Sequence, residues 1–422
     1  MIKTFELFPG ITLRCYQDGR FKQGRLSLQL VRPMSAGEAP RNSLLPMVLL
    51  RGTQKHPDLR SITMHLDDLY GATVGDLVRR IGDYQTSGFY CSFTEDRFAL
   101  PGDQILAPMV AFLGELLLDP LTEKGCFCRE IVESEKKNLI ADIESERNDK
   151  ATYAGSRLLR TMCRGDSFGI PRLGDADLAA AIDEADLYAH YRRILRESPI
   201  ELFYVGSAQP QQVAALLKPL FETIDRHYVN LPAQTPFQDA GCQQTQEEMD
   251  ITQSRLCMGF VTPITNRTPE FAAMQVLNTI FGSGMTSKLF LNVREKMSLC
   301  YSIGSGYYGA KGILTVSAGI DADKVQTVRQ EVMRQLAACQ SGDITAEELN
   351  AARESVISSL RSVPDSPGSI EGYYATAALS GLSMTTQQYR DAVQAVTLDG
   401  VIAAANTVVP HSEFFLRGCS HG

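Results

Sequence analysis

The 422-residue sequence predicts an α+β fold made of two homologous domains, each an antiparallel sheet with helices packed on one face. Three observations carry this prediction. Strand patterns stand in groups beside helical patterns and do not alternate with them, which favours antiparallel pairing. A polar, proline-containing stretch without periodicity interrupts the chain near its middle. The order of elements before this stretch returns after it, and so long a period indicates duplicated domains and not a solenoid.

The elements of the first half follow from two periodicities. Alternating apolar residues predict strands, and apolar residues three and four apart predict helices. In chain order the first half contains a strand at 26–31, helices at 42–50 and 61–69, strands at 75–80 and 86–94, a long helix at 104–118, and a helix from 120 to about 143.

The second half repeats that order. It contains a strand at 253–261, helices at 269–281 and 286–296, strands at 301–308 and 312–320, and a long helix at 322–339. The next helix opens with a capping box, because Thr345 can accept from first-turn amides and Glu348 follows three residues later. Thr122 holds the corresponding place in the first half. With the linker at 229–245, the predicted domains are 1–228 and 246–422.

Composition excludes several classes of protein. A formal net charge of −8 offers no basic surface to nucleic acid. No apolar run approaches the roughly 18–20 residues that span a bilayer, and no secretory signal is recognisable, so we expect a cytoplasmic protein without a membrane partner.

The ten cysteines have no regular spacing. Their one close pair, Cys126 and Cys128, falls in a predicted helix; reduced cysteines are the favoured interpretation over a metal or redox pair.

The most specific string of the chain lies in its second half. FGSGMTSKLFLNVREK at 281–296, followed by LCYSI at 299–303, closely resembles the signature of the pitrilysin/insulinase zinc peptidases, peptidase family M16. The segment 188–217 is similar to the family's tyrosine-rich helix and the strand after it. This resemblance implies a clamshell of homologous α+β domains. It also implies a zinc site, which active members build from an H-x-x-E-H motif on a helix.

The metal-binding positions of the motif are not preserved here. Two histidines one helical turn apart can share a metal, and the glutamate between them activates the bound water. Alignment on the RGT at 51–53 places these three positions at Ser43, Pro46 and Met47, none of which supplies an imidazole or a carboxylate. Pro46 also predicts that the helix begins at or near that residue.

A later acid completes the zinc site of the family. The pair Glu135 and Asp142 resembles the family's two acids seven residues apart, with Asp142 at the ligand position. We interpret Asp142 as a solvated helix acid, because no histidine accompanies it. His56 stands in a predicted loop and is not favoured as a ligand. The sequence therefore predicts neither a metal nor another cofactor in this chain.

The resemblance implies a second set of site residues. Arg294 and Tyr301 match the arginine and tyrosine with which the family binds the peptide carbonyl and stabilises the oxyanion, a task suited to a guanidinium and a phenol. The alternatives are an exposed helix cation paired with Glu295 and a tyrosine in a strand core. Gly282, Ser283 and Gly284 would form a flexible loop over the peptide, or only a turn before a helix.

The edge strand that binds extended peptide in this family corresponds to Gly75, Asp76, Leu77 and Val78. The arginines that follow at 79 and 80 can instead protect the edge from aggregation.

These features predict a non-zinc subunit of a heterodimeric peptide-processing metalloendopeptidase. Such a chain would bind the peptide substrate and dimerise with a zinc-bearing family member, and zinc is expected only in that partner. The alternative is an inactive structural or peptide-binding homologue that acts as a scaffold subunit.

Overall fold

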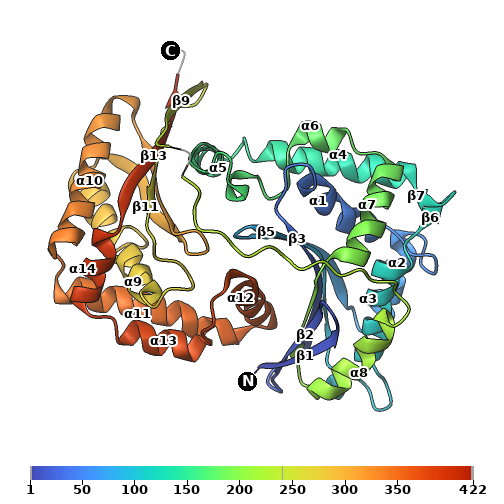
Figure 1. Ribbon diagram of the computed structural model, residues 1–422. Coiled ribbons are helices and arrows are strands. Elements are labelled where there is room, and N and C mark those ends of the chain that lie inside the picture. Colours follow the sequence, from blue (N-terminus) through green and yellow to red (C-terminus); the bar gives the residue numbers. More distant parts are fainter. Residues whose placement is uncertain (1, 240, 420–422) are drawn as a thin grey trace. The chain divides into compact units, whose positions relative to one another are not determined.

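The computed structural model describes residues 2–239 and 241–419, so residue 1, residue 240 of the predicted linker and residues 420–422 lie outside the described part. The chain forms two compact units (Figure 1). The first unit comprises the residues up to Glu144, Ile170–Ala233 and Pro364–Thr376. The second comprises Ser145–Gly169, Gln234–Val363 and the residues from Ala377 onward. These interleaved units differ from the contiguous spans 1–228 and 246–422, because each takes one segment from the other half of the sequence.

The first unit is built on a six-stranded sheet in the order β1-β2-β8-β3-β5-β4. All neighbouring strands pair antiparallel except β2 and β8, which are parallel. The antiparallel prediction therefore holds for every pairing but one. The strands are β1 (Ile2–Phe8), β2 (Ile11–Gln17), β3 (Gln23–Pro33), β4 (Thr73–Ile81), β5 (Tyr84–Thr94) and β8 (Ile200–Gly206).

Helices cover both faces of this sheet. One face packs against the main helical layer, and a single helix, α12 (Pro367–Ser380), lies on the other. Alternation along β8 separates the two faces, because Leu202 joins the main core while Phe203 packs with Ile370 of α12. The main layer consists of α1 (Ala39–Leu49), α2 (Leu59–Asp68), α3 (Leu106–Leu118), α4 (Arg129–Ser145), α6 (Ala176–Ala180), α7 (Glu184–Glu197) and α8 (Pro210–Phe221).

The second unit repeats the topology of the first. Its sheet has the order β11-β12-β10-β13-β9, with β13 and β9 parallel. This order matches β4-β5-β3-β8-β2 strand for strand, including the place of the parallel pair, so the prediction of duplicated domains is confirmed. The strands are β9 (Gln244–Met249), β10 (Ser254–Val261), β11 (Cys300–Tyr308), β12 (Ile313–Ile320) and β13 (Val409–Gly418).

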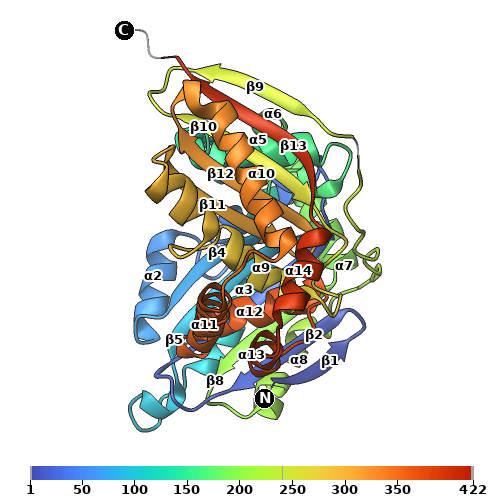
Figure 2. The ribbon, with the colours of Figure 1, turned by 90° about the vertical axis from the view of Figure 1, so that its left-hand side faces the viewer.

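The second sheet is also covered on both faces. In Figure 2 helix α10 (Val325–Ser341) runs across one face of its strands. The opposite face receives α5 (Lys150–Met162), whose Ala154 and Leu158 pack on Cys257 and Phe414. The other helices are α9 (Phe271–Phe281), a π-helix at Leu289–Lys296, α10 (Val325–Ser341), α11 (Ala346–Ser362), α13 (Thr386–Gln394) and α14 (Leu398–Asn406). No helix in the described part of the chain is both long enough and apolar enough to cross a bilayer.

Two local predictions are wrong. A short hairpin, β6 (Thr122–Glu123) and β7 (Cys126–Phe127), replaces the predicted helix start at 120, and α4 begins only at Arg129. Positive φ values at Lys124 and Gly125 make the turn, so Cys126 lies in a hairpin and not in a helix. Thr122 is therefore a strand residue, whereas the capping box of α11 at Thr345 is confirmed.

Helix α1 also begins earlier than predicted. It starts at Ala39 with Pro40 in its first turn, and Pro46 lies in its interior. A proline there leaves the carbonyl of Asn42, one turn earlier, without its helical donor. The hydroxyl of Ser87 on β5 donates to that carbonyl, so the helix continues through Pro46.

Candidate functional site

The positions of the zinc motif are filled by packing and hydrogen bonds within the first unit. Ser43 is buried on α1; its hydroxyl donates to the Ala39 carbonyl at 2.9 Å, and Gln85 Nε2 lies 3.2 Å from it. Pro46 is buried, and Met47 packs against the main core. None of these side chains points a metal ligand into a shared space.

A directed chain of hydrogen bonds runs from this position to α7. Gln85 Nε2 donates to the carbonyl of Arg172 at 2.8 Å, and its Oε1 accepts from Asn42 Nδ2, also at 2.8 Å. Asn42 Oδ1 lies 2.7 Å from His190 Nε2, and His190 Nδ1 lies 3.1 Å from an Arg193 nitrogen. An arginine only donates, so Nδ1 accepts and Nε2 carries the proton. Burial lowers the pKa of His190 to about 4, which keeps this imidazole neutral.

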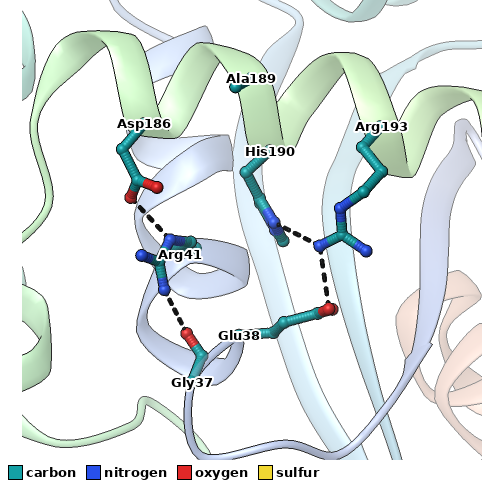
Figure 3. Close-up of a pocket in the computed structure, with 7 residues that line it drawn as sticks. All are labelled: Gly37, Glu38, Arg41, Asp186, Ala189, His190 and Arg193. Carbon is teal, nitrogen blue, oxygen red and sulfur yellow. Dashed lines mark hydrogen bonds and ion pairs between the residues drawn. The ribbon is translucent and has the colours of Figure 1, made fainter.

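The outer end of this chain opens into a hollow of about 450 Å³ between α1 and α7 (Figure 3). Its charged side chains satisfy one another. Arg41 pairs with Asp186 at 2.6 Å, and Arg193 pairs with Glu38 at 2.8 Å while also contacting His190. The hollow therefore presents paired charges to any ligand.

The two acids of α4 take different environments. Glu135 is buried and pairs with Arg51 at 2.5 Å, whereas Asp142 is exposed. The guanidinium of Arg51 thus neutralises Glu135, the first of these two acids. Within residues 2–239 and 241–419, no three His, Cys, Asp or Glu side chains are grouped so that they could hold a metal ion.

Gly75, Asp76, Leu77 and Val78 lie on β4, the outermost strand, which pairs only with β5. A side chain at Gly75 would collide with the ring of Tyr90 across the ladder, at 2.7 Å, so the glycine is explained by strand packing.

The two arginines that follow on β4 are both engaged. Arg79 forms a bidentate pair with the buried Glu371 of α12, and Arg80 donates to the carbonyl of Ile170 at 3.1 Å. The interpretation of Arg79 as an edge-protecting charge is therefore wrong, because its charge is spent within the unit.

Arg294 and Tyr301 are exposed on the second unit. Arg294 lies on the π-helix, stacks 4.7 Å over the ring of Phe290 and approaches Glu295 at 3.7 Å. Tyr301 is 61% exposed, so the alternative of a strand core residue is wrong. It sits at a bulge of the edge strand β11, a feature that re-aims a side chain, and donates to Asp321 at 3.0 Å. This hydrogen bond raises the pKa of the Tyr301 hydroxyl.

The glycine loop after α9 is pinned at its start. The carbonyl of Gly282 accepts from the Ser305 amide of β11 at 3.1 Å. A Cβ on Gly282 would approach Leu289 and the Ser305 hydroxyl at 2.7 Å, so close approach explains this glycine. Ser287 then closes a turn onto the carbonyl of Gly284. The geometry is that of a turn leading into the next helix, and flexibility of Ser283 and Gly284 stays a prediction.

Comparison with known proteins places this geometry in a family. A family model described as "Peptidase M16 inactive domain" matches residues 181–356. The chain is 26% identical over 409 residues to "Probable inactive metalloprotease YmfF" of Bacillus subtilis (strain 168), which covers 97% of this chain and 96% of that protein. The crystal structure of a conserved protein from Enterococcus faecalis V583 has a TM-score of 0.92 at 26% identity, covering 100% of this chain and 99% of that one. The chain is therefore a homologue of the M16 peptidases.

The fold comparison extends to a more distant M16 structure. The peptidase M16 inactive domain from Pseudomonas fluorescens has a TM-score of 0.81 at 17% identity, over 99% of this chain and 98% of that one. In this chain the helix that corresponds to the zinc motif is α1, and its motif positions hold Ser43, Pro46 and Met47. It is an M16 homologue without the family's zinc ligands.

Three features of the site escaped the sequence analysis. These are the neutral His190, the buried Glu371 and the loop around Arg172. Each depends on partners far away in the chain, and Glu371 binds Arg79 across 292 positions. The only sequence signal near them is the P-R-L-G string at 171–174, which predicts a turn but not where the turn packs.

Proposed function

We propose that this chain is the non-zinc subunit of a heterodimeric M16 peptidase. It contributes substrate binding and oxyanion stabilisation, and a zinc-bearing family member contributes the metal. The observation that carries the proposal is the contrast between the two halves of the M16 chemistry. The positions of the zinc motif are packed, whereas Arg294 and Tyr301 present their polar groups at the surface.

The chemistry of the two exposed residues fits this role. A guanidinium carries fixed donors, and a phenol can donate to developing negative charge on a peptide carbonyl. Stacking on Phe290 steadies Arg294, and the bulge of β11 turns Tyr301 away from the core. Neither side chain is required to fill the interior of the unit, so a role at the surface accounts for both.

A scaffold role is the second candidate. The observation that favours it is the hydrogen bond from Tyr301 to Asp321, which already satisfies the phenol. A clamp requires Tyr301 to exchange Asp321 for the substrate carbonyl.

The test is reconstitution with an M16 protein that carries a complete H-x-x-E-H motif. Tyr301→Phe removes only the hydroxyl and should lower kcat by on the order of 10²–10³, with association unchanged. Arg294→Ala should act in the same direction. Matched controls are Tyr228→Phe and Arg361→Ala, an exposed tyrosine and an exposed arginine elsewhere, which should leave kcat unchanged. Full peptide cleavage by the double variant Arg294→Ala, Tyr301→Phe would reject the clamp and favour the scaffold.

A further inference from the structure

The loop that precedes α6 lies against the free edge of β4. Arg172 donates from its guanidinium to the carbonyl of Val78 at 3.1 Å, and Arg80 of β4 donates to the carbonyl of Ile170 at the same distance. All of these residues belong to the first unit. The sheet has no further strand on this side among the described residues, so the loop takes the place next to the edge.

The backbone of Arg172 is fixed by buried contacts, whereas its side chain is exposed and is held by the hydrogen bond to Val78. Its carbonyl accepts from Gln85 Nε2 at 2.8 Å, and the Ser43 hydroxyl oxygen lies 3.4 Å from it. Gly174 follows with a φ of +88° and packs against Pro40, where a Cβ would come within 2.5 Å. The Arg172 side chain is exposed and forms no ion pair with any described residue. The loop therefore presents an unpaired cation from a fixed base.

The hairpin geometry shows which backbone groups this cation competes for. β4 and β5 are joined by the two residues between Ile81 and Tyr84, and the residues flanking such a turn form a hydrogen-bonded pair. Pairs alternate along an antiparallel ladder, so Val78 opposite Ser87 is not hydrogen-bonded to β5. The N–H and C=O of Val78 therefore point to the free edge. Arg172 covers an acceptor that an added strand would use.

We propose that Arg172 sets a preference for acidic peptides at the β4 edge. This inference rests on the proposed peptide-binding function and names its substrate class. An extended peptide that adds to β4 takes over the Val78 carbonyl and displaces the guanidinium. Because the backbone of Arg172 stays anchored at Gln85, its charge remains beside the new strand. A Glu or Asp side chain of the peptide then replaces the lost hydrogen bond, and a neutral peptide leaves the displaced cation without a partner.

Among the described residues, no other carboxylate at the β4 edge pairs with the Arg172 guanidinium once a peptide displaces it. Arg79 is neutralised by Glu371, and Asp76, the carboxylate of β4 itself, forms no ion pair with Arg172. The interaction is solvent-exposed, so its contribution is modest and screened by salt. We expect acidic peptides to bind about three- to tenfold more tightly than neutral ones at low salt, with the difference shrinking as salt is added.

The experiment measures binding to the full chain alone, by fluorescence anisotropy. Two labelled peptides of equal length and β-propensity differ only in Glu against Gln at alternate positions. Wild type should prefer the Glu peptide. Arg172→Gln should remove the preference and leave the Gln peptide bound as well or better, whereas Arg172→Lys should retain part of it. Arg361→Gln, an exposed arginine on α11, is the matched control and should retain all of it.

A second variant tests the location. Val78→Pro removes an outward N–H that β5 does not use, so the sheet should persist while both peptides bind more weakly. Equal affinity of wild type for the two peptides, a preference that survives Arg172→Gln, or no binding of either peptide would each overturn the inference. These outcomes are separable from failure of the proposed function, which is read from cleavage by the heterodimer with Arg294 and Tyr301 changed.

Discussion

The buried carboxylate of Glu371 should be one of the largest single contributors to the stability of the first unit. It has no solvent exposure and joins α12 to β3 and β4. Arg79 donates to both of its oxygens, at 2.9 and 2.6 Å, and Ser27 and Gln29 donate at 3.0 and 3.2 Å. Arg25 lies 3.9 Å away and stacks on the ring of Tyr90. One acid thus satisfies several buried donors.

Glu371→Ala would leave those donors and two guanidinium groups without their partner. Breaking a buried ion pair by removing one member costs about 3–5 kcal/mol, because the remaining charge is uncompensated. Glu371→Gln keeps the shape and one acceptor oxygen, so we expect a smaller loss of about 1.5–3 kcal/mol. Against a typical stability of about 5–15 kcal/mol, the alanine variant should shift the unfolding of this unit visibly.

The assay is urea unfolding followed by far-UV circular dichroism, because the chain contains no tryptophan. Glu354→Ala is the matched control: its pair with Arg361 is 3.8 Å long and more than half exposed, so the loss should stay within about 0.5 kcal/mol. The double variant Glu371→Met, Arg79→Met should be less destabilised than Glu371→Ala, because only one guanidinium, that of the more distant Arg25, then loses its partner. A cost below about 1 kcal/mol for Glu371→Ala would refute the reasoning.

Three further outcomes follow from the structure. The pKa of His190 falls from 6.5 to about 4 on folding, so the free energy of unfolding is highest above pH 6.5 and decreases as the pH drops toward 4, by at most about 3 kcal/mol. Urea unfolding at pH 7 and at about pH 4 should show this decrease in wild type and not in His190→Gln. The same decrease in His190→Gln would contradict the assignment. Gly282→Ala should cost about 1–3 kcal/mol by calorimetry through its clash with Ser305, while Gly37→Ala, with open space around it, should not. Elemental analysis of the purified chain should find no stoichiometric zinc, and one tightly held zinc per chain would disprove the loss of the site.

Local patterns in the sequence predict most of the architecture. The repeat of elements, the hairpin of β11 and β12 and the capping box at Thr345 all depend on residues close together in the chain. The exchange of α5 and α12 between the halves does not. The sequence of neither helix says which sheet it covers, and only the tertiary contacts decide this. From the sequence Glu371 would be taken for a surface acid, because its partner Arg79 lies 292 positions away in the chain.

The local errors have local causes. A proline such as Pro46 is typical of a helix start, but Pro40 takes that place six positions earlier. Ser87 donates to the Asn42 carbonyl that Pro46 leaves without a helical donor. The hairpin at Lys124 and Gly125 contains a glycine that favours a turn, yet the capping pattern at Thr122 competes with it. In both places two sequence patterns predict different local structures, and the sequence alone does not decide between them.

The loss of the zinc site extends beyond the motif positions of α1. The Ser43 hydroxyl shares Gln85 and the carbonyl of Arg172 with its neighbours, so an imidazole at that position would have to displace both. An acid in place of Pro46 would restore the amide that pairs with the Asn42 carbonyl, and Ser87 would then have to share this acceptor. Two of the three motif positions are thus tied to hydrogen bonds that a metal ligand there would disturb. Helix α1, which holds these positions, is part of the hydrogen-bonded interior of the first unit, and its chain of polar side chains ends at the neutral His190.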